Sequence, residues 1–307
     1  MRVLLAGTPE IAIPIFESIR MSRNEVVAVL TNPPRARGRS IAMVPSPVHD
    51  WSRQHQLPIH TDLDNPEFIG ALSTVDIVLV VAYGKLIPKA LLRAPKFGWL
   101  NVHFSHLPEA RGAAPVQRLI ESGAQDIGYT LFQLDAGMDT GPIFHRSSPI
   151  KVGTLTTGQI WDALAHEAAA EIVGLLETIY EGAAPIPQEI YAGKVPTAPK
   201  ISTAEARIEW NDPADVIERK IRAYNPTPSA WTYFRGDRFI VHRAVDILSA
   251  SDTQKSPGEW EIKGNELLVA TGMGQLQLLE VQPAGKKAMM ASDWLRGVQI
   301  QGGEFFE

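Results

Sequence analysis

The chain has 307 residues, of which 45% are hydrophobic and 21% charged, and these values are typical of a soluble globular protein with two domains. The complete lack of cysteine excludes disulfides, thiolate catalysis and zinc held by sulfur. A net charge of −5 argues against a broad nucleic-acid-binding surface, and no run of about 18 apolar residues is present to span a membrane.

The first half of the sequence alternates between apolar strand-like runs and amphipathic helix-like segments. The run at 3–6 is predicted to be a strand rather than part of a signal peptide, because no small-residue cleavage site follows it. Further strands are predicted at 25–30, 75–82, 97–102 and 129–134, and helices at 10–19, 48–56, 66–72, 115–122 and 157–179. Near-continuous apolar strands separated by helices indicate an α/β fold with a parallel sheet covered on both faces.

The composition changes after residue 181. Segments rich in Gly and Pro without a period indicate a linker at 182–204. A helix is predicted to start at Asn211-Asp212-Pro213 and to run to about Ala223. Five short strands follow, at 230–234, 238–244, 259–262, 267–271 and 276–281. So many strands in a short span suggest a small closed or nearly closed barrel, so we expect domains at 1–181 and 205–307.

The most informative polar residues are Asn101 and His103, which follow the uncharged run at 97–100. Side chains two residues apart on a strand point to the same face, and open α/β sheets bind ligands beyond the carboxyl ends of their strands. An amide could donate to an oxyanion there and an imidazole could transfer a proton. The pair is therefore a candidate active site, although each residue alone is as readily structural.

Asp139 lies between glycines in the segment 137–141 and could bring a carboxylate to the imidazole. An Asp in that setting is usually a turn former, so it is the weaker candidate. His106 is out of phase with the first pair and is expected to line a pocket or face solvent. The turn Gly7-Thr8-Pro9 after the first strand lacks a glycine fingerprint, so we interpret it as a simple strand-to-helix connection.

Two basic clusters have alternative interpretations. Arg35, Arg37 and Arg39 lie in a segment with Pro and Gly, where charge alone favours a solvated loop. The alternative is an arm for an anionic partner, because arginine forks suit phosphate oxygens. The second cluster, at 219–222, lies on the predicted helix with Ile217 and Ile221 pointing inward, and a solvated face is the default there.

Several motifs resemble one enzyme family. NVHFSHLPEARGAAPVQ, GMDTG, VVAYGKLIPKALL and VPSPV closely resemble the formyltransferase domain that uses 10-formyltetrahydrofolate. EARIEWNDPADVIERKIRAYNPTPSAW and QPAGKKAM resemble the C-terminal part of the methionyl-tRNA formyltransferase family. The resemblance runs essentially end to end. It implies a Rossmann-like catalytic domain followed by a small OB-like β-barrel that binds tRNA.

The resemblance also implies roles for particular residues. Asn101, His103 and Asp139 fall on the family's catalytic triad. The residues that fall on its folate-binding segment and on a pocket-lining loop are Ser105, His106, Leu107 and Pro108, with Tyr83 and Gly84. Arg39 falls on the arginine of a loop that enters the acceptor end of the tRNA. We take Arg35, Arg37, Arg219, Lys220 and Arg222 as further candidate tRNA contacts.

Two departures from the family pattern are present. His106 stands where the family usually has leucine, so it is expected to alter the folate contacts. Ile41-Ala42 stand where many relatives carry lysines, which lowers the expected charge of the tRNA loop.

The implied activity is formyl transfer from 10-formyltetrahydrofolate to the α-amino group of methionyl-initiator tRNA, for translation initiation. Asn101 and protonated His103 would stabilise the charge on the formyl oxygen, while Asp139 orients the imidazole and helps remove the amine proton through a water molecule. The expected partners are the tRNA and the folate, with no metal, membrane or protein partner. The expected location is the cytoplasm, as bacterial cytosol or an organelle matrix.

Three other functions are weighed against this one. The same catalytic domain could formylate another amine, such as a glycinamide ribonucleotide or an amino-sugar nucleotide, but those relatives lack this C-terminal sequence. A non-catalytic RNA-binding module is disfavoured, because residues 205–307 hold 12 Lys and Arg against 15 Asp and Glu, a net charge of −3. A nicotinamide dehydrogenase is disfavoured because the glycine fingerprint is missing.

Overall fold

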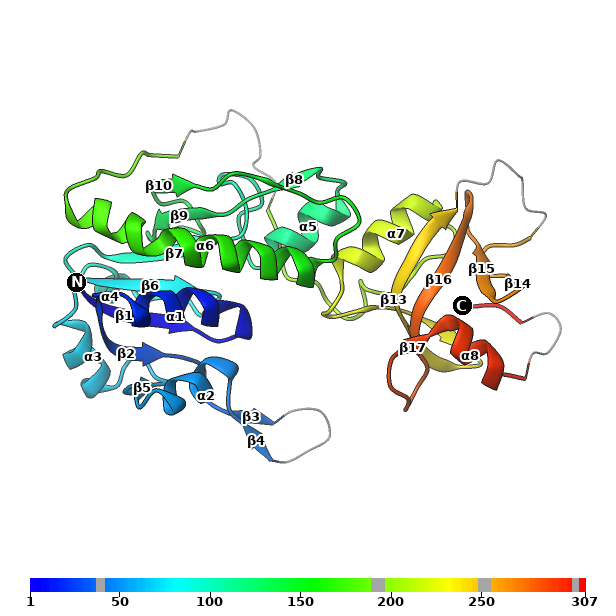
Figure 1. The fold of residues 1–307 in the computed structure, drawn as a ribbon, viewed down its shortest axis with the longest axis horizontal. Helices are drawn as coiled ribbons and strands as arrows, with labels where there is room; N and C mark the ends of the chain where they lie inside the picture. The colour runs from blue at the N-terminus through cyan, green and yellow to red at the C-terminus, as the bar shows by residue number, and fades with distance from the viewer. Residues whose placement is uncertain (37–41, 189–196, 248–254, 300–303) are drawn as a thin grey trace. The chain divides into compact units, whose positions relative to one another are not determined.

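The computed structural model describes residues 1–36, 42–188, 197–247, 255–299 and 304–307 (Figure 1). The chain forms two compact units. The first comprises 1–115, 126–151 and 161–198, and the second comprises 116–125, 152–160 and 199–307. None of the helices in the described ranges is long and apolar enough to cross a membrane.

A seven-stranded sheet forms the centre of the first unit. Its strands, in spatial order, are β10 (Ile143–Arg146), β9 (Thr130–Gln133), β7 (Trp99–His103), β6 (Ile77–Val81), β1 (Arg2–Gly7), β2 (Glu25–Leu30) and β5 (Ile59–His60). Neighbours from β7 to β5 are parallel, which confirms the predicted α/β fold. The strands β9 and β10 continue the sheet in antiparallel pairs beside β7.

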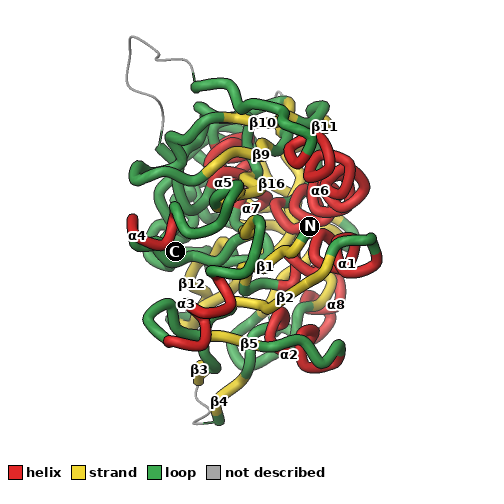
Figure 2. The backbone as a smooth tube through the Cα atoms, turned by 90° about the vertical axis from the view of Figure 1, so that its left-hand side faces the viewer, coloured by secondary structure: helices red, strands yellow, loops and turns green. Residues whose placement is uncertain are grey.

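Helices cover both faces of this sheet. Figures 1 and 2 show α1 (Ile13–Met21) and α6 (Thr157–Tyr180) on one face, and α3 (Pro66–Leu72) and α4 (Lys89–Leu92) on the other. The helix α2 (Pro47–Gln54) lies beside α1 (Figure 2). Ser46 caps α2 by accepting a hydrogen bond from the backbone N–H of His49. The buried strand residues are almost entirely apolar because helices exclude water from both sides.

The strand order reverses between β1 and β6, so the carboxyl ends of these neighbours diverge into separate loops. From β1 the chain builds outward through β2 to β5, and from β6 it builds outward through β7. His103 is the last residue of β7 and Asn101 is its central residue, so the pair predicted from the apolar run lies in the carboxyl-terminal half of this strand. The sheet therefore delivers the candidate pair to the edge at which α/β proteins bind ligands.

Short strand pairs were missed in the sequence. They are β3 (Arg35–Ala36) with β4 (Met43–Val44), and β8 (Asp126–Ile127) with β11 (Ile150–Lys151). Two residues are too few to display a period of two, so nothing in the local pattern distinguishes them from loops.

The second unit contains an antiparallel sheet in the order β12 (Ala230–Phe234), β13 (Asp237–Ile247), β16 (Gln275–Gln282), β15 (Glu266–Ala270) and β14 (Trp260–Lys263). A further strand, β17 (Met289–Met290), pairs with β16. This unit also contains α7 (Ala214–Ala223) and α8 (Ala291–Gly297). The helix α5 (Pro115–Glu121) belongs to it except for Pro115, and so do the first four residues of α6. All five predicted strands are present.

The C-terminal residues connect the two ends of this sheet. Tyr233 of β12 exchanges two backbone hydrogen bonds with Glu307, at 3.2 and 3.0 Å. The Phe306 N–H donates to the carbonyl of Gly258, two residues before β14, at 2.9 Å. The segment 305–307 therefore spans the opening between β12 and β14, which agrees with the expected nearly closed barrel.

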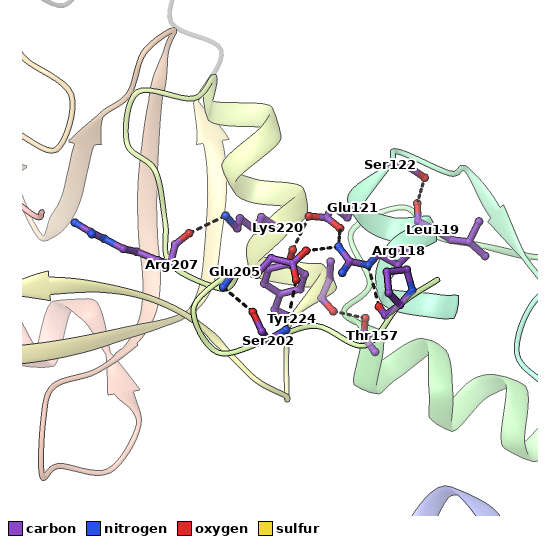
Figure 3. A network of polar contacts seen from close by, with 12 residues as sticks. Arg118, Leu119, Glu121, Ser122, Thr157, Ser202, Glu205, Arg207, Lys220 and Tyr224 are labelled. Atoms are coloured by element: carbon purple, nitrogen blue, oxygen red, sulfur yellow. Dashed lines mark hydrogen bonds and ion pairs between the residues drawn. The ribbon is translucent and has the colours of Figure 1, made fainter. Parts of the chain in front are cut away.

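A polar network holds α5 and α7 together within the second unit (Figure 3). Arg118 Nη1 lies 2.5 Å from Glu205 Oε1 and 2.9 Å from Glu121 Oε2. The Tyr224 hydroxyl donates to Glu121, and Thr157 donates to the carbonyl of Ala223 at 2.6 Å. Burial and the Glu121 carboxylate raise the pKa of Tyr224, so its hydroxyl stays a donor at neutral pH.

Phe306 completes the aromatic core of the second unit. It is 2% exposed, and its ring centroid lies 5.1–6.3 Å from those of Phe239, Trp260 and Trp294. We expect Phe306→Ala to lower the free energy of unfolding of this unit by about 3–5 kcal/mol, because it removes a buried ring and leaves a cavity. Urea unfolding followed by tryptophan fluorescence measures the change. The adjacent Phe305 is 54% exposed, so Phe305→Ala should change it by less than about 0.5 kcal/mol. Equal effects would contradict this assignment.

Candidate active site

Strand β7 presents Asn101 and His103 on one face. Asn101 lies between Val80 of β6 and Phe132 of β9, and His103 pairs with Thr130 of β9. His103 is buried, and its ring meets that of Phe132 edge-on at 6.2 Å and 89°. Because β6 and β9 fix β7 from both sides, the amide and the imidazole start from a rigid backbone.

The two ring nitrogens of His103 have different partners. Nε2 lies 3.1 Å from the carbonyl oxygen of Ala110, which can only accept, so Nε2 carries the hydrogen in the neutral ring. Nδ1 lies 3.8 Å from Oδ2 of Asp139, too far for a direct hydrogen bond but close enough for charge interaction. The basic nitrogen of His103 therefore faces the carboxylate.

Asp139 is held by the backbone around it. Its Oδ2 accepts the N–H of Gly112 at 2.8 Å, and its φ of 52° lies in the left-handed region. A side chain at Gly141 would bring a Cβ within 1.8 Å of the carbonyl oxygen of Gln133, so glycine is required there. The glycines on either side of Asp139 thus permit a tight loop, and the residue with the strained backbone in this loop is Asp139 itself.

Gln188 fixes the same loop from outside the predicted site. Its Nε2 donates to the carbonyls of Asp139 and Gly141, at 2.9 and 2.8 Å. Its Oε1 accepts from Nη2 of Arg111 at 2.5 Å. Neither residue was predicted: Arg111 was only part of a loop motif, and Gln188 fell in the expected linker. No local signal identifies this contact, because it joins positions 77 residues apart.

Burial lowers the pKa of His103 below its usual 6.5, although the Asp139 carboxylate and the Ala110 carbonyl act in the opposite direction. The imidazole is therefore neutral in the resting protein at pH 7. Because the folded-state pKa lies below the unfolded one, the fold loses stability as the pH falls below 6.5 toward the lowered value.

We expect the imidazole resonances of His103 to titrate with a midpoint below 6.5 and to show the Nε2–H tautomer. Nitrogen-15 NMR of histidine-labelled protein measures both, with the His103→Ala variant assigning the signals. A midpoint above 6.5, or a hydrogen on Nδ1 at high pH, would contradict the geometry.

The segment Ser105–Pro108 is anchored to β9 and β10. Thr130 Oγ1 donates to the carbonyl of Ser105 at 2.7 Å and accepts a hydrogen bond from the N–H of Leu107 at 3.0 Å. Arg146 donates to the carbonyl of Leu107 through Nε and Nη2, at 3.1 and 2.7 Å. Ser105, Leu107 and Pro108 are buried, so these residues support the loop from within.

His106 contacts the backbone at Ser147 and Gly128. Its Nε2 lies 3.0 Å from the carbonyl oxygen of Ser147, and its ring covers Gly128, where a Cβ would approach Nε2 to 2.0 Å. The absence of a side chain at Gly128 makes room for the imidazole. A contact between His106 and the folate stays a prediction.

Hydrogen bonds link the residues that follow β1, β2 and β6, next to the point where the strand order reverses. Asn32, after β2, donates through Nδ2 to Thr8 Oγ1 at 2.9 Å and to the carbonyl of Tyr83, after β6, at 3.0 Å. The Tyr83 ring is buried, which raises the pKa of its hydroxyl to about 12. At Gly84, φ is 76° and a Cβ would meet open space. Thr8 and Asn32 were not predicted as site residues.

The candidate tRNA contacts are placed differently from one another. Arg35 is exposed on β3, whereas Arg37 and Arg39, with Ile41, lie outside the described residues. On α7, Arg219 pairs with Asp215 at 2.7 Å, and Arg222, 12% exposed, pairs with Glu218 at 2.6 Å. Lys220 donates to the carbonyl of Arg207 at 2.7 Å (Figure 3). These three cations are engaged within the unit, so their contact with tRNA stays a prediction.

Among the described residues, no group of three or more His, Asp and Glu side chains is arranged to hold a metal ion. The chemistry that the site can perform rests on an amide donor, a neutral imidazole and a carboxylate. These groups suit acyl transfer, in which an oxyanion develops and one proton moves.

Comparisons with known proteins agree with this chemistry. The family model "Formyl transferase" matches residues 1–179, and "Formyl transferase, C-terminal domain" matches 200–299. A methionyl-tRNA formyltransferase of Salinispora tropica is 41% identical over 308 residues, covering 99% of each chain.

Two solved structures share the fold at low sequence identity. HypX from Aquifex aeolicus, in complex with tetrahydrofolic acid, matches with a TM-score of 0.67 and 15% identity, over 100% of this chain and 50% of that one. A methionyl-tRNA formyltransferase from Clostridium thermocellum matches with a TM-score of 0.58 and 17% identity, over 92% and 98%. The present chain thus spans about half of HypX.

Proposed function

This chain belongs to the methionyl-tRNA formyltransferase family, and on that premise we propose that Asn101, His103 and Asp139 catalyse its reaction. The enzyme transfers a formyl group to the α-amino group of methionyl-initiator tRNA. The observation that carries the proposal is the approach of the Asp139 carboxylate to the His103 imidazole, at 3.8 Å, on the strand that also carries Asn101 two residues before. We propose 10-formyltetrahydrofolate as the formyl donor.

The reaction forms one C–N bond and breaks another. The amine nitrogen attacks the formyl carbon, and the carbonyl electron pair moves onto oxygen, where the Asn101 amide donates a hydrogen bond. His103 takes the amine proton at Nδ1, since Nε2 is already protonated and bound to Ala110. Asp139 stabilises the resulting imidazolium.

Collapse of the oxyanion completes the transfer. The electron pair returns to the carbonyl, the bond from the formyl carbon to N10 breaks, and His103 returns its proton to the departing nitrogen. One proton therefore travels from the amine to the folate. His103 begins and ends neutral, which fits its lowered pKa. This sequence of steps differs from the expectation from the sequence, in which protonated His103 stabilises the formyl oxygen and Asp139 helps to remove the amine proton through a water molecule, because the lowered pKa favours a neutral imidazole before the reaction.

We also propose a division of labour along the chain. Residues 1–181 would hold the chemistry, 182–204 would link the domains, and 205–307 would contribute tRNA binding. Arg39, with Arg35 and Arg37, would contact the acceptor end. The arginine forks of this segment and the family membership support that assignment.

Transfer of labelled formyl from 10-formyltetrahydrofolate to methionyl-initiator tRNA tests the function directly. Product should appear with the acylated tRNA and be absent with unacylated tRNA, which lacks the amine. Transfer to a small amine, such as an amino-sugar nucleotide, with none to the acylated tRNA would contradict the proposal.

A further inference from the structure

Two arginines flank a pair of neighbouring aromatic rings that lie on one face of β12. Trp231 and Tyr233 are two residues apart, and their rings meet edge-on at 5.1 Å and 85°. The guanidinium of Arg238 lies 4.8 Å from the Trp231 ring, and that of Arg207 lies 5.6 Å from the Tyr233 ring. The neighbouring Phe234 packs against the core instead. We call Arg207, Trp231, Tyr233 and Arg238 the arginine–aromatic stack.

The backbone and the indole hold this stack in place. The segment beside β12 is fixed by bonds from Ile208 N–H to the Trp231 carbonyl at 2.7 Å and from Trp231 N–H to the Ala206 carbonyl at 3.0 Å. The indole Nε1 donates to the Thr203 carbonyl at 2.7 Å. Figure 3 shows the Arg207 side chain extending away from α7, while its carbonyl accepts from Lys220. Both guanidinium groups are therefore positioned before any ligand arrives.

The charges of this stack are not neutralised within the described residues. Neither Arg207 nor Arg238 has an ion pair there, whereas Arg219, Arg222 and Arg235 each pair with a carboxylate. The Nε atoms of Arg207 and Arg238 are buried and have no hydrogen-bond partner in that part of the chain; Arg219 Nε is in the same state, but Arg219 pairs with Asp215 through Nη1. An unpartnered buried donor is unfavourable, and stacking on an aromatic ring offsets only part of that loss.

We propose that Arg207 and Arg238 bind the phosphate backbone of the tRNA substrate, with Tyr233 and Trp231 as positioning residues. This inference rests on the proposed function, which supplies a polyanion for an otherwise acidic domain, with a net charge of −3 over 205–307. Guanidinium forks match phosphate oxygens. Trp231 is only 9% exposed, so no base can stack on its ring. We therefore expect contact with the phosphates of the tRNA rather than with its bases.

Formylation kinetics of the full chain test the site. Arg207→Gln and Arg238→Gln should each raise KM for methionyl-tRNA by about 3- to 10-fold and leave KM for the folate nearly unchanged. The slope of log(kcat/KM) against log salt should become shallower by about one for each lost phosphate contact. Arg238→Lys should retain the salt slope, because it keeps the charge.

Arg296→Gln is the matched control, since it removes the same charge from an exposed arginine that pairs with Asp293. It should change neither the tRNA KM nor the salt slope. An unchanged slope in both test variants, or equal increases in KM for tRNA and folate, would overturn the inference. If the wild type formylates no tRNA, the proposed function fails. Filter binding of unacylated tRNA to the same variants then still decides between a phosphate site and a structural stack.

Discussion

His103→Ala and Asn101→Ala should each lower kcat/KM for formyl transfer by about 10²–10⁴ and 10²–10³ respectively. Removal of His103 eliminates the group that carries the proton from the amine to the folate. Removal of Asn101 eliminates a donor to the oxyanion, an interaction that strengthens only as charge develops. Both losses arise in the transition state, so kcat should fall with little change in either KM.

Steady-state kinetics on methionyl-initiator tRNA measure these losses, and circular dichroism establishes that each variant is folded. His166→Ala serves as a matched control, because His166 is exposed on α6 and, within the described part of the chain, its ring bonds only to the carbonyl of Asp162 in its own helix. It should retain full activity. If either test variant stayed within about tenfold of the wild type, the assigned catalytic residues would be wrong.

The part of the site that follows from the sequence is the part that a strand generates. The run before Asn101 and His103 is apolar because β7 is buried on both faces, and the two-residue period puts the pair on one face. Other elements with a clear apolar pattern were predictable for the same reason. Examples are β2, α3 and β12, whose bounds agree with the prediction.

The supporting contacts could not be predicted, because they join distant parts of the chain. Gln188 reaches the loop of Asp139 from 49 residues away, and Asn32 reaches the carbonyl of Tyr83 from 51 residues away. Neither residue type is unusual where it stands. Only the folded sheet brings the loops together, so their partners depend on topology rather than on local pattern.

The pairing of charges was also hidden in the sequence. Arg219 and Arg222 look like a basic surface, but each finds a carboxylate one helical turn earlier on α7. Arg207 and Arg238, which are isolated in the sequence, lie against aromatic rings and have no ion pair among the described residues. Counting charges along the sequence therefore does not show which arginines are paired within the fold.

Asp139→Asn should lower kcat by about 10²–10³ and lower the pKa of His103 further. The Asp139 carboxylate raises that pKa against the effect of burial, so its neutralisation makes Nδ1 a weaker proton acceptor. The amide has the same size, and its oxygen can still accept the N–H of Gly112, so the loop keeps its geometry. The midpoint of the His103 titration should consequently move to lower pH.

Asp135→Asn separates charge from geometry in the same loop. Among the described residues, the Asp135 carboxylate accepts from two neutral donors, Gly137 N–H and Thr140 Oγ1, at 2.9 and 2.7 Å, and an amide oxygen can replace it. This variant should keep kcat within about tenfold of the wild type and leave the His103 titration in place. Nitrogen-15 NMR and single-turnover kinetics on both variants provide the measurement. A His103 pKa that rises in Asp139→Asn, or equal losses of rate in the two variants, would mean that Asp139 acts through loop structure and not through its charge.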